Sequence, residues 1–249
     1  MLHGPLPDAV TTPLLFEPGE CWVYGGGLDW VGVLIERVSG VKFGKWLRDN
    51  VFDAVGCDER IGFDSGEMER AGEIVQVVSK GNGGKLKEFK VKEQELGVER
   101  GGGGLFSSAF NFAKLLVDII SPSPKLLPPE LVALLFTPSL LHSSPSLTAL
   151  RVSASKFKRM AGPLMPSSDV PDINHSLAGL IVTQDNEVLG NVNGTVTWAG
   201  AFNTMWFANR EQGVAGFYAS ALWPPGEERC SRLMEIFLKE TWKALDRGG

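Results

Sequence analysis

The sequence predicts an α+β fold, in which an antiparallel sheet is flanked by helices and joined to a helical subdomain. Three observations lead to this prediction. Apolar residues recur at helical spacing through the first half of the chain, short strand-like runs separated by turn residues fill the region from 176 to 220, and a long amphipathic segment follows them. We expect one domain over residues 1–249, with a mainly helical part at 14–175 and the sheet and last helix at 176–249.

Helical spacing predicts four helices in the first part of the chain. The first has Asp29 near its start and Gly40 as a stop signal, and its apolar side is expected to face the core. The third follows a serine N-cap, Ser107 or Ser108. The fourth runs from Pro129 to Phe136. The apolar positions of the other three are Leu28, Val31, Leu34, Ile35 and Val38 in the first, Phe43, Trp46, Leu47 and Val51 in the second, and Phe112, Leu115, Leu116 and Ile119 in the third.

Polar and glycine-rich stretches between these helices predict loops. Residues 61–100 are expected to form surface loops and short strands, with one strand at 73–78 and a solvated hairpin at 85–92. The four glycines at 101–104 lack the lysine and hydroxyl of a phosphate loop and therefore predict a tight turn. Residues 138–171 are interpreted as a long surface loop that belongs to a substrate lid, and His142 and His175 as polar surface residues.

The last third of the chain carries the strand signals. Strands are predicted at 176–183, 194–198, 202–208 and 213–220, with residues 209–213 as a hairpin turn. After the Pro224-Pro225-Gly226 break, a helix is predicted to run to Leu245 and to lie on the sheet. Its broad apolar stripe consists of Leu233, Met234, Phe237, Leu238, Trp242 and Leu245.

Composition excludes several classes of function. A net charge of −5 without a basic stripe argues against nucleic acid as a partner, and no apolar run is long enough to cross a bilayer. The three cysteines fit no metal spacing, so no metal and no cofactor are expected. Their odd number suits reduced thiols, and without a signal-like start the expected location is cytoplasmic.

Two short motifs carry chemistry. Tyr24 lies in the run Glu-Pro-Gly-Glu-Cys-Trp-Val-Tyr-Gly-Gly-Gly at the entrance to the first helix, and Trp198-Ala199-Gly200 lies on a predicted strand. With the glycine turn at 101–104, they resemble, in the same order, the motifs of the serine β-lactamase, penicillin-binding-protein and esterase superfamily. The likeness is to its fungal-type esterase and transesterase branch, and it covers residues 14–245.

The resemblance implies a role for each motif residue. Tyr24 would help to remove the proton from a nucleophilic serine, and Gly26 stands where an asparagine often orients substrate. Trp198 replaces the lysine or histidine that would hold a carboxylate, which favours neutral esters or thioesters. Gly200 would allow an acyl group to approach the backbone, and the amide of Ala201 would donate to the oxyanion. The alternative for Tyr24 and Trp198 is that both are packing aromatics.

The superfamily's Ser-x-x-Lys motif does not occur before Tyr24. Ser153 with Lys156 and Ser155 with Lys158 have the spacing but follow the tyrosine, and in a basic segment we attribute them to chance. The resemblance also implies two further strands beside 213–220 and a nucleophile helix, all expected to be missing here. The strand edge left open predicts self-association.

We therefore expect a β-lactamase/transpeptidase-like protein from a lineage of serine hydrolases or acyltransferases. Such proteins transfer the acyl group of a small-molecule ester or thioester through an acyl-serine, here in secondary metabolism. Without the nucleophile this chain is expected to be inactive or impaired. The alternative is a non-catalytic homologue that binds a hydrophobic small molecule or a partner protein.

Overall fold

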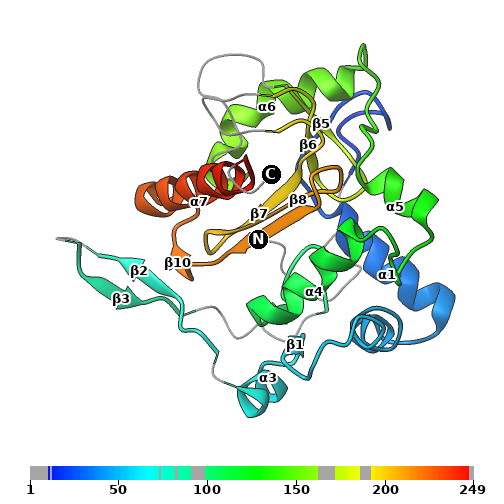
Figure 1. Ribbon diagram of the computed structural model, residues 1–249. Helices are drawn as coiled ribbons and strands as arrows, with labels where there is room; N and C mark the ends of the chain where they lie inside the picture. Colours follow the sequence, from blue (N-terminus) through cyan, green and yellow to red (C-terminus); the bar gives the residue numbers. More distant parts are fainter. Residues whose placement is uncertain are drawn as a thin grey trace.

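A computed structural model describes residues 11, 13–72, 74–81, 84–90, 99–161, 172–185 and 192–246, and it confirms the α+β architecture. A five-stranded antiparallel sheet lies at the centre, and helices pack against it (Figure 1). Its strands stand in chain order: β5 (Ile173–His175), β6 (Leu180–Val182), β7 (Val196–Gly200), β8 (Thr204–Asn209) and β9 (Val214–Tyr218). Among the described residues, no strand pairs with the outer edge of β9.

The predicted strand at 176–183 is wrong in its first half, because residues 176–179 form a tight turn between β5 and β6 and only β6 (Leu180–Val182) lies within the predicted range. The Ser176 hydroxyl accepts hydrogen bonds from the amides of Ala178 and Gly179, at 3.2 and 3.3 Å, and so stabilises the turn. Gly179 fits there because a Cβ would lie 2.7 Å from the carbonyl oxygen of Thr197. A small residue thus brings β6 close to β7.

The hairpin predicted at 209–213 is confirmed between β8 and β9. The side chain of Asn209 accepts a hydrogen bond from the amide of Gln212 at 3.0 Å, and Gly213 has a φ of 64°, a conformation that favours glycine. The hairpin places Trp206 opposite Phe217 and Met205 opposite Tyr218. Because successive side chains on a strand point to opposite faces, these two pairs lie on opposite faces of the sheet.

The last helix, α7 (Glu228–Asp246), covers one of these faces. Its start is capped by Glu227, whose carboxylate accepts the amides of Arg229 and Cys230 at 2.8 and 3.1 Å. The core between α7 and the sheet consists of Met205, Phe207, Cys230, Met234, Leu238 and Trp242. The predicted stripe is therefore correct in its centre but too broad, since Leu233 and Leu245 are exposed.

Helix α4 (Ala109–Ile120) packs against β9 on the other face, through Phe112 and Phe217 with ring centroids 4.8 Å apart. Its N-cap is Ser108, one of the two predicted serines, whose hydroxyl accepts the amide of Asn111 at 3.1 Å. Leu116 of this helix is buried as expected. The sheet therefore lies between α7 and α4 (Figure 1).

Helix α1 (Gly27–Ser39) ends where predicted, at Gly40 with a φ of 70°. The side that it buries was predicted wrongly. Asp29 and Gly32 are buried, whereas most of the apolar positions are exposed. The side of α1 that carries Gly32 packs closely on Gly101 and Phe43. The orientation of α1 is therefore decided by the close approach of two backbone segments. The exposed apolar side chains are Leu28, Val31, Leu34 and Val38.

The helix predicted at 43–52 is confirmed as α2 (Phe43–Leu47) continued by one π-helical turn (Arg48–Phe52). Residues 138–171 were predicted to be loop, and this is wrong for α6 (Pro145–Ala161), which lies on β5 and β7. Leu147 and Leu150 of α6 are fully buried, and the hydroxyl of Ser144 caps it by accepting the amide of Leu147 at 3.1 Å. Residues 162–171 lie outside the described residues.

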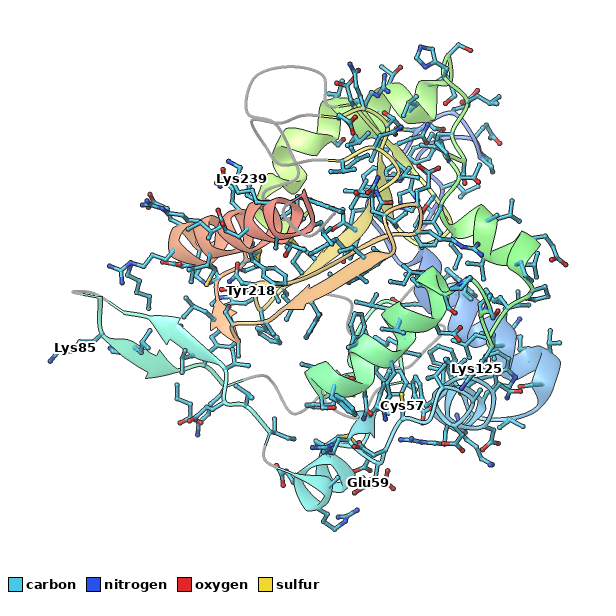
Figure 2. All side chains as sticks on the ribbon, viewed as in Figure 1. Cys57, Glu59, Lys85, Lys125, Tyr218 and Lys239 are labelled. Atoms are coloured by element: carbon cyan, nitrogen blue, oxygen red, sulfur yellow. The ribbon has the colours of Figure 1, made fainter. Side chains whose placement is uncertain are left out.

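The remaining elements surround this core. Residues 61–100 contain short strands and loops as predicted, although the strand expected at 73–78 begins at Val78, and a helix also occurs. Figure 2 shows Lys85 at the outer end of the hairpin formed by β2 (Val78–Lys80) and β3 (Leu86–Glu88). Within the predicted 85–92 hairpin, β3 is one exposed strand of that hairpin, and residues 91 and 92 lie outside the described residues. These elements are α3 (Ser65–Ala71), α5 (Pro129–Leu135, as predicted), the pair β1 (Ile61–Gly62) and β4 (Phe106–Ser107), and the sheet of β10 (Leu222–Trp223), β2 (Val78–Lys80) and β3 (Leu86–Glu88).

Candidate active site

Tyr24 and Trp198, the two aromatic residues of the predicted motifs, are in contact. Tyr24 lies on the loop before α1 and Trp198 on β7, and their rings are stacked with centroids 6.0 Å apart and planes inclined by 14°. The side chain of Tyr24 remains 47% exposed. At that separation the rings are offset and parallel, the favoured geometry of an aromatic pair. The two motifs therefore meet at these two rings.

His175 extends this pair into a cluster of four rings. Its imidazole lies 5.9 Å from the ring of Trp198 and 6.1 Å from that of Trp22, between centroids. The prediction of a polar surface histidine is therefore wrong, because His175 is half-buried on β5 among aromatic side chains. Trp22 and Trp198 also pack against the buried cluster of Leu147, Leu150, Ile173 and Leu180.

The protonation of His175 follows from its contacts. Nδ1 lies 2.6 Å from the carbonyl oxygen of Ser176, and since a carbonyl only accepts, Nδ1 carries the proton. The pKa of His175 is lowered by burial, although the Ser176 carbonyl opposes that effect. The neutral ring therefore has its lone pair on Nε2.

Hydrogen bonds hold β5 in place around this histidine. The side-chain amide of Asn174 donates to the carbonyl of Leu140 at 2.9 Å, and its oxygen accepts the backbone amide of Leu140 at 3.0 Å. The amide of Ser139 donates to the carbonyl of His175 at 2.8 Å. These bonds fix the backbone that carries the imidazole.

The loop that carries Tyr24 is tied down on both sides. Before it, the carbonyl of Gly19 accepts a hydrogen bond from the hydroxyl of Ser146 on α6, at 2.6 Å. After it, the buried carboxylate of Asp29 accepts the amide of Gly102 at 2.9 Å. The predicted tight turn at 101–104 thus docks on the start of α1, where a Cβ on Gly101 would lie 2.0 Å from the carbonyl oxygen of Leu28.

The other predicted site residues lie near the ends of the two motifs. Gly26 bends the chain before α1, and its carbonyl accepts the amide of Trp30 at 3.1 Å. Gly200 ends β7 opposite Thr204, and Ala201 is exposed in the turn that follows. A Cβ on Gly200 would lie 2.3 Å from the hydroxyl of Thr204, so the glycine also serves the β7–β8 connection.

Reasoning from the sequence missed Trp22 and His175. Trp22 stands two residues before Tyr24, and this spacing in an extended loop could have indicated a second ring on the same side. For His175 there was no such signal, because the β5–β6 turn that brings it to Trp198 depends on contacts with β7.

Two further features bear on the chemistry. Within the described ranges, no group of three or more histidine, cysteine, aspartate or glutamate side chains is arranged to hold a metal ion. In the same part of the chain, every helix is too short or too polar to span a membrane. The serines at 153 and 155 lie on α6, whose side chains at 154–161 are outside the described residues.

A family model described as Beta-lactamase matches residues 7–241. The chain belongs to the beta-lactamase family. Its relatives include fungal acyltransferases and esterases. Acyltransferase calJ of Penicillium decumbens is 31% identical over 92% of this chain and 55% of that protein. Lovastatin esterase of Penicillium rubens is 27% identical over 95% of this chain and 59% of that protein.

Solved structures agree with this assignment. The LovD9 mutant of simvastatin synthase from Aspergillus terreus has a TM-score of 0.81 at 25% identity, over 94% of this chain and 58% of that chain. EstCE1, described as a hydrolase with promiscuous acyltransferase activity, shares the fold with a TM-score of 0.69 at 15% identity. This beta-lactamase-family chain thus spans between half and two thirds of the length of the relatives named here, 55% of calJ and 59% of the esterase.

Proposed function

We propose that the ring cluster of this chain is an acyl site that binds the acyl group of a small-molecule ester or thioester for acyl transfer in secondary metabolism. The observation that carries the proposal is the contact between Tyr24 and Trp198. The contact joins a phenol, which can accept or donate a proton, to a ring that offers an apolar surface. Relatives named as acyltransferases and esterases support the same class of reaction.

The residues of the site have distinct proposed roles. Tyr24 is the proton-accepting partner of a serine–lysine pair, and Trp198 and Gly200 line the acyl group. The amide of Ala201 donates to the oxyanion, and Gly26 gives the substrate access where an amide side chain would stand. Because the rings around Tyr24 are uncharged, the site favours a neutral acyl group over one that bears a carboxylate.

We further propose that these 249 residues by themselves bind an ester far better than they turn it over. No serine-lysine motif precedes Tyr24, and catalytic groups that act as a unit lose most of their effect when one of them is removed. A phenol without an activating cation is a weak base at neutral pH, since an ordinary phenol has a pKa of about 10. Binding of a hydrophobic small molecule without turnover is the alternative function of the same site.

An ester assay tests this proposal. With p-nitrophenyl butyrate, we expect hydrolysis at the buffer rate, and no change for Tyr24→Phe. We also expect the ester to quench tryptophan fluorescence in a saturable way, and Trp198→Ala to weaken that binding about tenfold or more through lost aromatic contact. Turnover well above the buffer rate that disappears in Tyr24→Phe would contradict the proposed inactivity, and Ser155→Ala would then test a substitute nucleophile.

A second copy of the chain is the proposed partner of the open side of the sheet. The outer edge of β9 has no strand partner among the described residues, and beside it α7 exposes Leu233 (52%) and Ile236 (47%). Phe237 joins the two features, since its ring lies 6.3 Å from that of Tyr218 on β9. A shallow apolar groove continues along α7 and is lined by Ile236, Phe237, Glu240, Thr241, Ala244 and Leu245.

Charge on α7 selects a second copy as the occupant. Arg229, Leu233, Ile236 and Glu240 are spaced by four, three and four residues, so they share one side of the helix, and all four are exposed. When two copies of α7 cross antiparallel at the centre of this stripe, Arg229 of each copy faces Glu240 of the other, and Leu233 faces Ile236. Glu240 also contacts Lys243 at 2.7 Å, an exposed pair that costs little to rearrange.

Charge reversal tests the dimer. We expect sedimentation to show a dimer in the micromolar range, weakened about tenfold by Arg229→Glu or by Glu240→Arg, because each change creates two like-charge contacts. The double variant restores the opposite charges and should recover most of the affinity. A monomer at all accessible concentrations, or single variants that dimerise as the unchanged chain does, would refute the arrangement.

A further inference from the structure

We propose that His175 is a specificity residue of the ring cluster, and that its Nε2 accepts a hydrogen bond from a hydroxyl group of the bound molecule. This inference rests on the proposed function, and it specifies the class of molecule as uncharged with an apolar body and a free hydroxyl. Within acyl transfer, such a molecule is an alcohol that receives the acyl group.

The position of His175 supports this role. His175 lies between Trp22 and Trp198, and Trp198 is stacked on Tyr24, so a molecule that contacts the two motifs also comes near the imidazole. The ring is half-buried and keeps part of its surface open to solvent. An apolar molecule that covers these rings would displace water from the remaining surface.

The hydrogen bonding of the imidazole leaves one of its nitrogen atoms as an acceptor. The proton on Nδ1 is committed to the carbonyl of Ser176 at 2.6 Å, which leaves Nε2 as an acceptor in the neutral ring. The structure shows no hydrogen bond from a described residue to Nε2. An acceptor covered by a ligand loses its hydrogen bond to water, and the ligand must replace that bond or bind more weakly.

The imidazole of His175 is uncharged, as an acceptor role requires. Burial lowers the pKa of His175, which keeps the ring neutral at pH 7. The strands β6 and β7 beside it carry no ionisable side chain. On α6, the side chain of Arg151 donates a hydrogen bond to the carbonyl of Ile173 at 3.1 Å. The other ionisable residues nearby are Asp172, which directly precedes β5, and four residues on the neighbouring loops: Glu20, Cys21, Tyr24 and His142.

The backbone of His175 is held in place by hydrogen bonds. The backbone amide of His175 donates to the side chain of Asn174 at 2.7 Å, and its carbonyl accepts from Ser139 at 2.8 Å. A polar group held in place in an apolar setting discriminates strongly, because a ligand that lacks the matching donor leaves it unpaired. A carboxylate, which has no proton to donate, would meet the lone pair of Nε2 and be disfavoured.

A matched pair of probes tests this inference. 1-Naphthol and 1-methoxynaphthalene have the same rings, but only the naphthol has an O–H donor. By calorimetric titration at pH 7, the unchanged chain should bind the naphthol about five- to tenfold more tightly. His175→Phe keeps a ring but removes the acceptor, so this preference should vanish while 1-methoxynaphthalene binds within about threefold of the unchanged chain. His175→Gln, which offers an amide oxygen, should retain part of the preference.

Three results separate the outcomes. Equal binding of the two probes by the unchanged chain would overturn the role of His175 and leave the acyl-site proposal intact, whereas binding of neither probe would overturn both. A preference that survives in His175→Phe would also refute the role. Nitrogen NMR of the imidazole gives a test that needs no variant: a proton on Nδ1 is expected, and a proton on Nε2 would contradict the acceptor role. Circular dichroism of both variants checks that they are folded.

Discussion

Replacing Phe207 by alanine should destabilise the protein by about 3–5 kcal/mol, the largest effect that we expect from a single substitution. Phe207 is fully buried at the centre of the core between the sheet and α7. Its ring lies 5.9 Å from that of Phe237 and 5.7 Å from that of Trp242. It also occupies the space above Gly216, where a Cβ would lie 2.4 Å from the ring. Alanine would leave a cavity that the neighbouring strands cannot close.

Urea unfolding followed by circular dichroism measures this effect. Phe110 is the matched control, because it has the same side chain but is largely exposed on α4. Phe110→Ala should cost less than about 1 kcal/mol, mainly through the contact of its ring with Lys114. Similar losses in the two variants would show that the sheet and α7 do not form the principal core.

Gly101→Ala should destabilise the protein by about 3 kcal/mol through a backbone clash rather than a cavity. The added Cβ would lie 2.0 Å from the carbonyl oxygen of Leu28, and this oxygen belongs to the backbone of α1, which cannot turn aside as a side chain would. The turn must move away from α1, and the hydrogen bond from Gly102 to Asp29 would be strained with it.

The same turn contains the control for this experiment. A Cβ on Gly103 would meet no other atom within 4 Å, and the φ of Gly103 is not positive. Gly103→Ala should therefore change the free energy of unfolding by less than about 1 kcal/mol. The two alanine variants differ only in which glycine carries the methyl group. A Gly101→Ala protein as stable as Gly103→Ala would show that the turn does not pack on α1 as described.

Much of the fold could be predicted because its signals are local. The hairpin at 209–213 has an asparagine and a glycine where the backbone needs them, and Ser108 and Gly40 mark helix ends by chemistry that depends only on nearby backbone. In contrast, α6 has many serines and a weak apolar pattern, and it was missed because Leu147 and Leu150 become informative only when β5 covers them.

The candidate site likewise has parts that the sequence indicated and parts that it did not. Tyr24 and Trp198 were found because each belongs to a short motif with a known order along the chain. The orientation of α1 was predicted wrongly, because its exposed apolar side gives a stronger periodic signal than the buried side with Asp29 and Gly32. A close contact between backbones depends on the absence of side chains, and hydrophobic periodicity does not detect it.

Taken alone, the sequence determined the class of fold, most helix ends and the β8–β9 hairpin, and it singled out the two motif residues of the candidate site. These follow from interactions between residues that are near in the chain. Only the tertiary structure decided that Trp198 stacks on Tyr24, that His175 joins them with its lone pair on Nε2, and that Gly101 seals the turn against α1. Those contacts join segments far apart in the chain, and their geometry exists only once the sheet and its helices have packed together.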